Sequence, residues 1–156
     1  MRRAELALPS EECRAVLKRG DYGTIAMLGA DGAPYAVPVN YYYHEQENAL
    51  FFHCAEEGEK LDALRHCDRV CFTVVEQYQT VPEKLTSHFQ CVIVKGKVSL
   101  ITDHAQRARR LEELCLRFCS KALTKEQIRD KAQGGAGKTM VVQIEVLELT
   151  GKGKRT

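Results

Sequence analysis

The sequence lacks several features that would assign it to a class at once. None of its apolar runs approaches the roughly 20 residues of a transmembrane helix. No apolar signal region follows Arg2 and Arg3. The 23 basic residues nearly balance the 21 acidic ones, and the resulting formal net charge of +2 argues against a nucleic acid or a membrane surface as the main partner. We therefore expect a cytoplasmic protein.

The seven cysteines lack the spacing of a metal or redox motif. The sequence contains no C-x-x-C pair, the cysteine count is odd, and the five histidines are scattered. Cys67 and Cys71 are four residues apart, as are Cys115 and Cys119, and a helix would stack the second pair on one face. We predict reduced cysteines that pack as small apolar residues, and no metal site. A structural zinc site and one exposed redox thiol are the alternatives.

The composition is that of an ordinary globular chain. With 156 residues, 44% of them hydrophobic and 28% charged, we expect one domain spanning residues 1–156. The patterns predict strands over 22–28, 34–43, 49–54, 69–75, 88–100 and 140–149. They predict helices over 10–20, 60–66 and 103–119 and from 124 onward. Helices placed outside the strand pairs favour an antiparallel sheet closed into a small barrel with peripheral helices, a mainly β (α+β) fold.

Local signals refine this pattern. Asp31-Gly32 predicts a hairpin turn, and Pro38 predicts an edge or bulged strand because proline cannot donate a ladder hydrogen bond. Gly96 marks a bend or bulge. The polar run 77–87 and the glycine-rich run 133–137 are both interpreted as loops.

The run GGAGKT at 134–139 is similar to a nucleotide-binding P-loop but fails its spacing. The first glycine of that motif would fall at Ala132, five positions before Gly137. The context is also reversed, since a P-loop follows a strand and opens a helix. Here the run follows a helical pattern and precedes a strand, so we interpret it as a flexible connection.

The most informative segment is LFFHCAEEGEKLDAL at 50–64. An apolar strand leads through His53 into a turn at Gly58, and Lys60 opens a helix. Unpaired amides at a helix start and a lysine can bind an anion such as phosphate. The alternative for Lys60 is an ordinary solvated lysine. His53 is either a core histidine or a cavity residue whose imidazole donates a hydrogen bond or a proton.

Five runs follow one another along the chain, namely GAPY at 32–35, VPVNYYY at 37–43, LFFHCAEEGEKLDAL at 50–64, DRVCFTV at 68–74 and CVIVKGKVSL at 91–100. In this order they resemble the pyridoxamine 5′-phosphate oxidase-like, FMN-binding split-barrel superfamily. Within it, the chain is most similar to the branch associated with 5-nitroimidazole resistance, the Nim proteins.

The resemblance implies a homodimer of six-stranded antiparallel split barrels of Greek-key type, with FMN at the subunit interface. Lys60 would bind the flavin phosphate, and Cys91 would approach the flavin ring from the partner subunit. The remaining cofactor-binding positions would be Val37, Pro38, Val39, Asn40, Tyr41, Tyr42, Phe52 and His53, with the first strand contacting the flavin largely through main-chain atoms.

The chain departs from the oxidase pattern at three points. Glu59 stands where the oxidases have an arginine, and Cys91 stands where glutamine or serine is expected. The true oxidases also use a C-terminal tryptophan and arginine segment, whereas this chain has no tryptophan. Oxidation of vitamin B6 is therefore rejected as the reaction.

The function expected from the resemblance is an FMN-dependent reductase of a small molecule, with nitroimidazoles as the example and His53 as the candidate catalytic residue. A flavoprotein without a dedicated substrate is the first alternative. A haem-binding protein is the second, with His53 or His88 as the candidate ligand.

Overall fold

The computed structural model describes residues 3–154, so residues 1–2 and 155–156 of the predicted domain lie outside the described residues. The strands are β1 (Tyr22–Leu28), β2 (Pro34–Asn40), β3 (Tyr42–His44), β4 (Ala49–Cys54), β5 (Arg69–Val81), β6 (Thr86–Ile101) and β7 (Met140–Lys154). The helices are α1 (Ser10–Arg19), α2 (Glu59–His66), α3 (His104–Cys119) and α4 (Lys125–Gly135), with short 3-10 turns at Ala4–Leu6 and Pro82–Lys84. None of the helices within residues 3–154 is long and apolar enough to cross a membrane.

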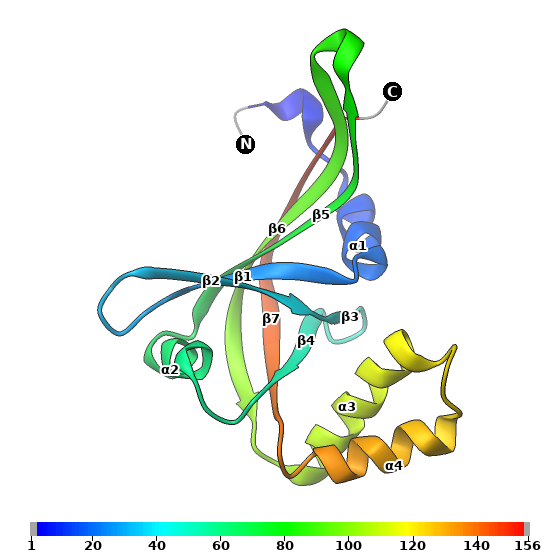
Figure 1. Ribbon diagram of the computed structural model, residues 1–156. Coiled ribbons are helices and arrows are strands. Elements are labelled where there is room, and N and C mark those ends of the chain that lie inside the picture. The colour runs from blue at the N-terminus through cyan, green and yellow to red at the C-terminus, as the bar shows by residue number, and fades with distance from the viewer. Residues whose placement is uncertain (1–2, 155–156) are drawn as a thin grey trace.

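The sheet curls because its two edge strands are neighbours in the sequence. The strand order is β2-β1-β5-β6-β7-β4-β3, with every pair antiparallel. β2 and β3 lie at opposite edges, yet only Tyr41 separates them. The sheet must therefore bend until its edges meet, and β2 contacts β4 where they do (Figure 1). This confirms the mainly β, antiparallel split-barrel fold. The predicted strand 34–43 divides at Tyr41, which gives seven strands rather than six.

Tyr41 fixes the corner at which the chain passes from one edge to the other. Its ring is fully buried and meets the ring of Phe72 edge-on, with the centroids 5.0 Å apart. Its hydroxyl donates a hydrogen bond to the carbonyl oxygen of Leu17 at 2.9 Å, which ties the corner to α1. A tyrosine suits this place because it buries a large ring and still satisfies its polar group.

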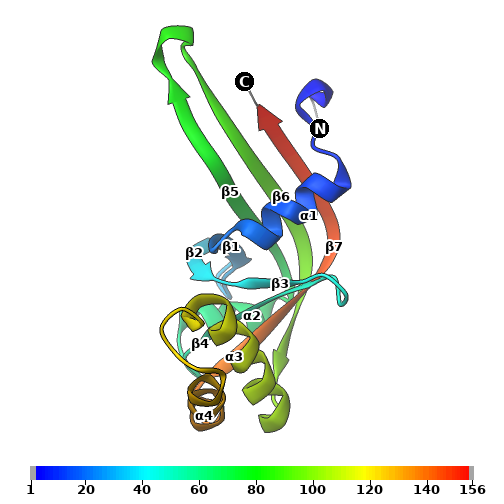
Figure 2. The same cartoon turned by 90° about the vertical axis from the view of Figure 1, so that its right-hand side faces the viewer.

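β5 and β6 form a long hairpin that projects beyond the barrel (Figures 1 and 2). The loop predicted at 77–87 is therefore wrong: the strands continue on both sides of the turn at Pro82–Lys84. The register shifts between Glu76 and Gln79, where Gln77 has a positive φ of 52°. The polar run lacks the apolar alternation by which strands are predicted. These strands do not need it, because outside the core main-chain hydrogen bonds hold the ladder together.

Other local predictions had mixed outcomes. Gly32 has a φ of 79° in the β1–β2 turn, Pro38 lies on an edge strand, and the β6–β7 register shifts next to Gly96. The predicted loop 133–137 is wrong at its start, because α4 continues to Gly135. Ala132 on this last part of α4 is buried in the helical core, and its packing outweighs the low helix propensity of glycine.

Two apolar cores meet at β4. One fills the barrel and contains Ile25, Phe52, Phe72 and Ile144; the other lies between the sheet and the α3–α4 pair and contains Tyr42, Phe51, Leu111, Leu114 and Val141. β4 reads as an uninterrupted apolar run because both of its faces are covered. Since side chains alternate along a strand, Phe52 faces the barrel interior, whereas Phe51 and His53 face α3.

Candidate functional site

A pocket of about 260 Å³ lies where the ends of β2 and β4 meet the last turns of α3. Asn40 and His53 line its sheet side, and its helical wall consists of Leu114, Cys115, Phe118 and Cys119. The Asn40 amide nitrogen donates a hydrogen bond to the Asp21 carbonyl oxygen at 3.0 Å, which orients the side chain. The pocket therefore combines mainly apolar walls with two polar groups, the usual composition of a small-molecule site.

His53 projects from β4 toward this pocket. It follows the buried Phe52, and strand alternation turns it outward, where its side chain is exposed. The alternative of a core histidine is therefore wrong. Although the side chain reaches solvent, the atoms packed around it partly desolvate the imidazole and lower the pKa of His53, and the nearby positive charge of Lys60 lowers it further. The imidazole is accordingly neutral near pH 7, with one nitrogen as donor and the other as acceptor.

Lys60 lies at the start of α2, as the sequence predicts. Gly58 precedes the helix with a φ of 120°, which favours glycine, and α2 begins at Glu59. The Lys60 ammonium lies 5.7 Å from the centroid of the Phe52 ring. This places a cation close enough to lower the pKa of both His53 and Cys54.

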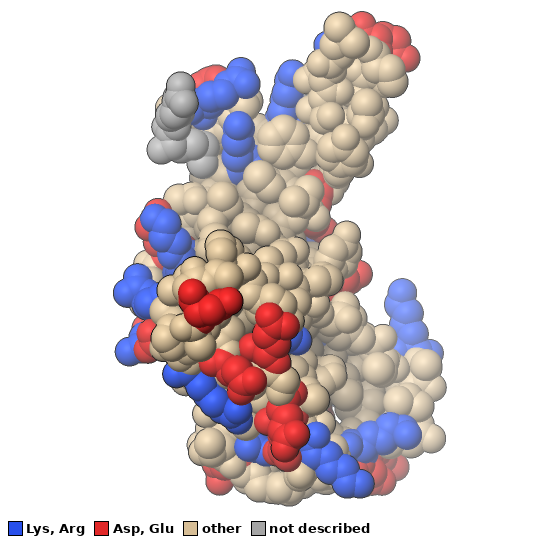
Figure 3. All heavy atoms as spheres, turned by 60° about the vertical axis from the view of Figure 1, so that its left-hand side comes forward, with Lys and Arg blue, Asp and Glu red and all other residues tan. Residues whose placement is uncertain are grey.

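Two carboxylates share the first turn of α2 with this lysine. Glu59 and Asp62 occupy the first turn of α2, and both line a neighbouring pocket of about 370 Å³ together with Asp31. Figure 3 turns the α2 side of the molecule forward and shows acidic side chains gathered on this face. An anion bound at the helix start would therefore be attracted by Lys60 and repelled by its neighbours.

The structure brings some of the remaining predicted residues to the pocket and separates others from it. Pro38 and Val39 line an adjoining pocket of about 310 Å³ that Asn40 shares. Val37 is half-buried on the same edge strand, next to the barrel core. The side chains of Tyr41, Tyr42 and Phe52 are instead buried in the two cores.

Cys91 lies apart from this group. It is half-buried on β6 opposite Val75 of β5, within the projecting hairpin. The buried neighbours Gln90 and Val92 face the α1 side, so Cys91 faces the opposite side of the sheet. Cys91 is therefore not among the residues that line the pocket with Asn40 and His53.

The helical wall of the pocket is held in place by arginines. From the sequence, Arg107, Arg109 and Arg110 are most simply a solvated helix face. This is wrong for two of them, because the side chains of Arg107 and Arg110 are each only 12% exposed. Arg107 binds Glu56 at 2.7 Å and the Ile101 carbonyl oxygen at 2.6 Å. These contacts join α3 to the segment that follows β4.

Arg110 joins α3 to the β3–β4 hairpin. Its guanidinium lies 4.2 Å from the centroid of the Phe51 ring and binds Glu47 at 2.6 Å. It also binds Glu113 at 2.9 Å, and Glu113 accepts a hydrogen bond from the Tyr42 hydroxyl. Burial raises the pKa of Glu113, but the hydrogen bonds from Tyr42 and Arg110 outweigh it and lower that pKa overall. The carboxylate is therefore ionised and pairs with Arg110.

Sequence reasoning missed the helical wall. Residues 111, 114, 115 and 118 have the spacing of an apolar helix face, and that pattern does not say which part of the face covers a core and which part lines a pocket. Leu111 and Leu114 are buried, whereas Phe118 is 38% exposed. The only signal in the sequence was the pair Cys115 and Cys119, four residues apart.

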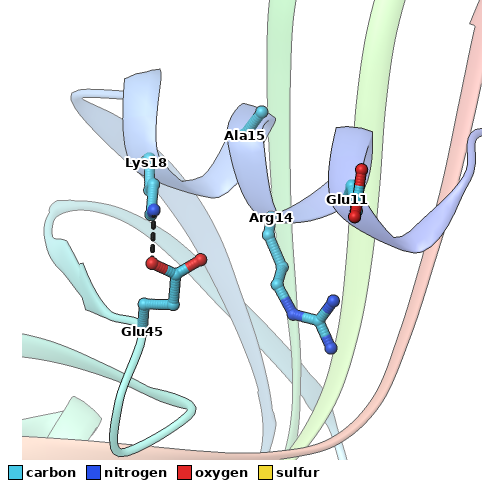
Figure 4. Close-up of a pocket in the computed structure, with 5 residues that line it drawn as sticks. All are labelled: Glu11, Arg14, Ala15, Lys18 and Glu45. Atoms are coloured by element: carbon cyan, nitrogen blue, oxygen red, sulfur yellow. Dashed lines mark hydrogen bonds and ion pairs between the residues drawn. The ribbon is translucent and has the colours of Figure 1, made fainter.

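A different pocket, of about 500 Å³, lies between α1 and the β3–β4 turn (Figure 4). Its charged lining consists of Glu11, Arg14, Lys18 and Glu45, and Lys18 pairs with Glu45 at 2.5 Å. None of the residues singled out in the sequence lies here. Since the lining is exposed and partly self-paired, it has the character of a solvated groove rather than of a binding site.

Comparison with known proteins supports one family. The family described as pyridoxamine 5′-phosphate oxidase matches residues 9–153, whereas comparison with curated proteins gives no match. A candidate 5-nitroimidazole antibiotic resistance protein from Bacteroides thetaiotaomicron superposes with a TM-score of 0.75 at 20% identity, covering 94% of this chain and 86% of that one. An FAD-binding protein from Mesorhizobium loti gives 0.69 at 22% identity, with 96% and 97% covered.

A third similar structure is the flavocytochrome Anf3 from Azotobacter vinelandii, with a TM-score of 0.75 at 19% identity, covering 100% of this chain and 72% of that one. At these identities the structures establish the shared fold. The family match extends from α1 almost to the end of β7, and thus includes every strand and helix that positions the pocket. On this match, the chain belongs to the pyridoxamine 5′-phosphate oxidase family.

Proposed function

We propose that this protein binds a flavin, FMN in the first instance, with the flavin ring in the pocket between β2, β4 and α3. The observation that carries the proposal is the meeting of Asn40, His53 and the apolar end of α3 around one pocket. The names of similar structures, an FAD-binding protein and a flavocytochrome, support the same class of ligand.

The residues of the pocket fit the ring of a flavin. The walls formed by Leu114 and Phe118 suit its planar aromatic surface, and Asn40 and His53 offer hydrogen bonds to its polar edge. β2 pairs with another strand on one side only within residues 3–154, so its main-chain groups can bind the ring as the resemblance implies.

The phosphate end has fewer suitable partners. The start of α2 and Lys60 would bind the phosphate, without the second basic residue that Glu59 replaces. Lys60 therefore becomes the residue on which affinity for the phosphate depends.

We also propose a homodimer with the flavin at the subunit interface. The face of the β5–β6 hairpin opposite α1 carries Thr73, Val75, Cys91 and Ile93, which the strand register places side by side. Val75 is 60% exposed and Ile93 is 43% exposed. An apolar face of this kind on a projecting hairpin is suited to a second copy of the chain. The pocket volume of about 260 Å³ is smaller than most ligand sites, which suggests that a partner completes it.

The proposed reaction is reduction of a small oxidised molecule such as a nitroaromatic compound. Bound flavin supplies the electron transfer, and the chain supplies position, polarity and access. The apolar wall of α3 excludes water from one side of the pocket, and the N–H group of neutral His53 donates a hydrogen bond toward a ligand beside it. Reduction of a nitroimidazole under anaerobic conditions, measured against free flavin alone, tests this activity. A rate no higher than that of free flavin would contradict this reaction. The proposal of flavin binding would then stand without nitroimidazoles as substrates.

The absorption spectrum of the purified protein tests the cofactor. We expect flavin bands, or their appearance on titration with FMN. A Soret band in their place would indicate haem. In that case His53 is the candidate ligand at the pocket, because His88 lies on the β5–β6 hairpin opposite Gln79. Colourless protein that takes up no FMN would refute both flavin hypotheses.

Lys60→Ala tests the phosphate site. We expect weaker binding of FMN and nearly unchanged binding of riboflavin, because riboflavin lacks the phosphate. Loss of one ion pair with phosphate corresponds to about 1.5–3 kcal/mol, or roughly 10- to 150-fold in the dissociation constant of FMN. Fluorescence titration measures both ligands, and Lys60→Arg is the control that keeps the charge. Equal weakening of FMN and riboflavin would show that Lys60 acts through folding.

A further inference from the structure

Two free thiols lie on the helical wall of the pocket. Cys115 and Cys119 are half-buried in the last turns of α3, and both line the same pocket. Residues four apart are neighbours on one helix face. The helix therefore presents both sulfur atoms to a single space, with the Phe118 ring beside them.

The two thiols interact with each other. Burial raises the pKa of Cys115, and the adjacent Cys119 raises it further through charge and a hydrogen bond. A metal ion that binds both sulfur atoms has to displace their protons, because the thiolate is the form of cysteine that ligates metals.

Helix geometry decides whether the two sulfur atoms can form a disulfide or can bind one metal ion between them. The Cβ atoms of residues four apart on a helix are about 5–6 Å from each other. A disulfide needs roughly 3.5–4.5 Å between its Cβ atoms, so it would distort the last turn of α3. A metal ion bound to two thiolates at about 2.3 Å each allows sulfur atoms up to about 4.6 Å apart, which undistorted helical positions can provide.

The coordination number restricts the metal. Within residues 3–154 no group of three or more His, Cys, Asp or Glu side chains could hold a metal ion, although His53 lines the same pocket. Zinc in structural sites takes four ligands and is therefore a poor candidate. Soft thiolate ligands select ions such as Cu(I), which also accept a coordination number of two.

We propose that Cys115 and Cys119 form a two-thiolate site for a soft monovalent ion of the Cu(I) class on the α3 wall of the pocket. On binding, each thiol releases one proton and the ion gains two sulfur bonds, with no change of oxidation state. The site does not depend on flavin binding, although an ion held there would narrow the proposed flavin pocket.

The chain offers a matched control. Cys67 and Cys71 have the same spacing, but Cys67 follows the last residue of α2 and Cys71 lies on β5, so no shared helix face brings them together. Both are free and half-buried, like the proposed pair. The variants C67S/C71S and C115S/C119S therefore remove the same number of thiols from comparable environments.

The test is an anaerobic titration of the reduced full-length protein with Cu(I) against a competing Cu(I) chelator. We expect wild type and C67S/C71S to retain one ion against the chelator, and C115S/C119S, C115S and C119S to lose it. Retention by C115S/C119S, or equal loss in C67S/C71S, would overturn the proposal. Thermal unfolding of each variant shows whether it is folded.

A second measurement uses unmodified protein. Wild-type protein carrying one equivalent of Cu(I) is alkylated with iodoacetamide, and the modified cysteines are identified by mass spectrometry. Protection of both Cys115 and Cys119 supports the site. Protection is counted as the loss of modification relative to metal-free protein. Such a loss at any other cysteine in preference to these two contradicts the site.

Discussion

At the scale of residues, the candidate site depends on how charge is placed near His53. Lys60 opens α2, its ammonium lies over the Phe52 ring, and its charge reaches His53 on the other side of β4. Lys60 on α2 and His53 on β4 therefore interact although they belong to different elements. The positive charge of Lys60 helps to keep the imidazole neutral.

The first prediction concerns the pKa of His53. In Lys60→Ala we expect this pKa to rise toward its ordinary value of about 6.5 and to stay below it, because burial is the larger cause. Lys60→Arg keeps the charge and should keep the wild-type pKa. An NMR titration of the imidazole ring measures both. An unchanged pKa in Lys60→Ala would show that the two charges do not interact.

The same shift predicts how stability depends on pH. Since the pKa of His53 is lower in the folded protein, the unfolded chain binds more protons between the two values. His53 therefore makes the free energy of unfolding fall as the pH drops from about 6.5 toward the lowered pKa. In Lys60→Ala the contribution of His53 to this decrease in the free energy of unfolding should be smaller. Urea unfolding at several pH values measures the decrease in both proteins.

A second prediction at this scale compares two glycines. A Cβ at Gly23 would lie 2.3 Å from Cε1 of the rigid Phe72 ring and 2.7 Å from the Thr73 carbonyl oxygen. Gly23→Ala should therefore destabilise the protein by about 1–3 kcal/mol. At Gly134, within α4, a Cβ meets no described atom within 4 Å, so Gly134→Ala should be neutral or stabilise by up to about 1 kcal/mol. Urea unfolding of both variants tests the contrast, and equal effects would contradict it.

At the scale of elements, α3 determines the shape of the pocket. Its apolar face packs on the outside of the sheet, and Arg107 and Arg110 hold it to the segments on either side of β4. Arg117 extends this attachment by donating to the Gly20 carbonyl oxygen at 2.7 Å, just beyond α1. The last turn of α3 is therefore fixed beside Asn40 and His53.

Arg110→Ala tests this attachment. We expect a loss of about 2–4 kcal/mol in the free energy of unfolding, because Glu47 and Glu113 lose a partner and the Phe51 ring loses its covering cation. Arg109→Ala is the matched control on the same helix. Its side chain is 66% exposed and pairs with Glu113 alone among the described residues, so the loss should stay below about 1 kcal/mol. Chemical denaturation measures both variants, and a similar loss in the two would refute the tethering role of Arg110.

At the scale of the whole molecule, the projecting β5–β6 hairpin has two unlike faces. α1 packs on one face (Figure 2). The other face carries the half-exposed side chains of Val75 and Ile93. The proposed dimer would bury this second face. It would also bring Cys91 of one copy toward the pocket of the other, in keeping with the position that the resemblance implies.

Ile93→Lys tests the proposed dimer. A charge at the centre of this face should shift the protein from dimer to monomer and weaken flavin binding with it. Leu28→Lys is the control, since Leu28 is 41% exposed, close to the 43% of Ile93, but lies on β1. Sedimentation velocity measures the mass of each. A wild-type monomer, or dissociation by both variants, would contradict an interface on this face.

The sequence alone determined the features that depend on neighbouring residues. The Asp31-Gly32 turn, the strand bounds of β1 and β4 and the helix start at Thr124 were all predictable, because turn, alternation and capping signals extend over a few positions. The antiparallel barrel followed from the order of those elements. The lysine at the start of α2 followed from one continuous segment.

Only the tertiary structure decided which distant segments share the pocket. The end of α3 lies beside Asn40 and His53, although it is more than 60 residues from either in sequence. The Arg110 side chain is only 12% exposed, whereas that of its neighbour Arg109 is 66% exposed, because Arg110 packs on the Phe51 ring and pairs with Glu47. The β5–β6 hairpin continues through a polar run because main-chain pairing holds it together. In each case the contact across the fold provides the free energy, and no local pattern in the sequence records it.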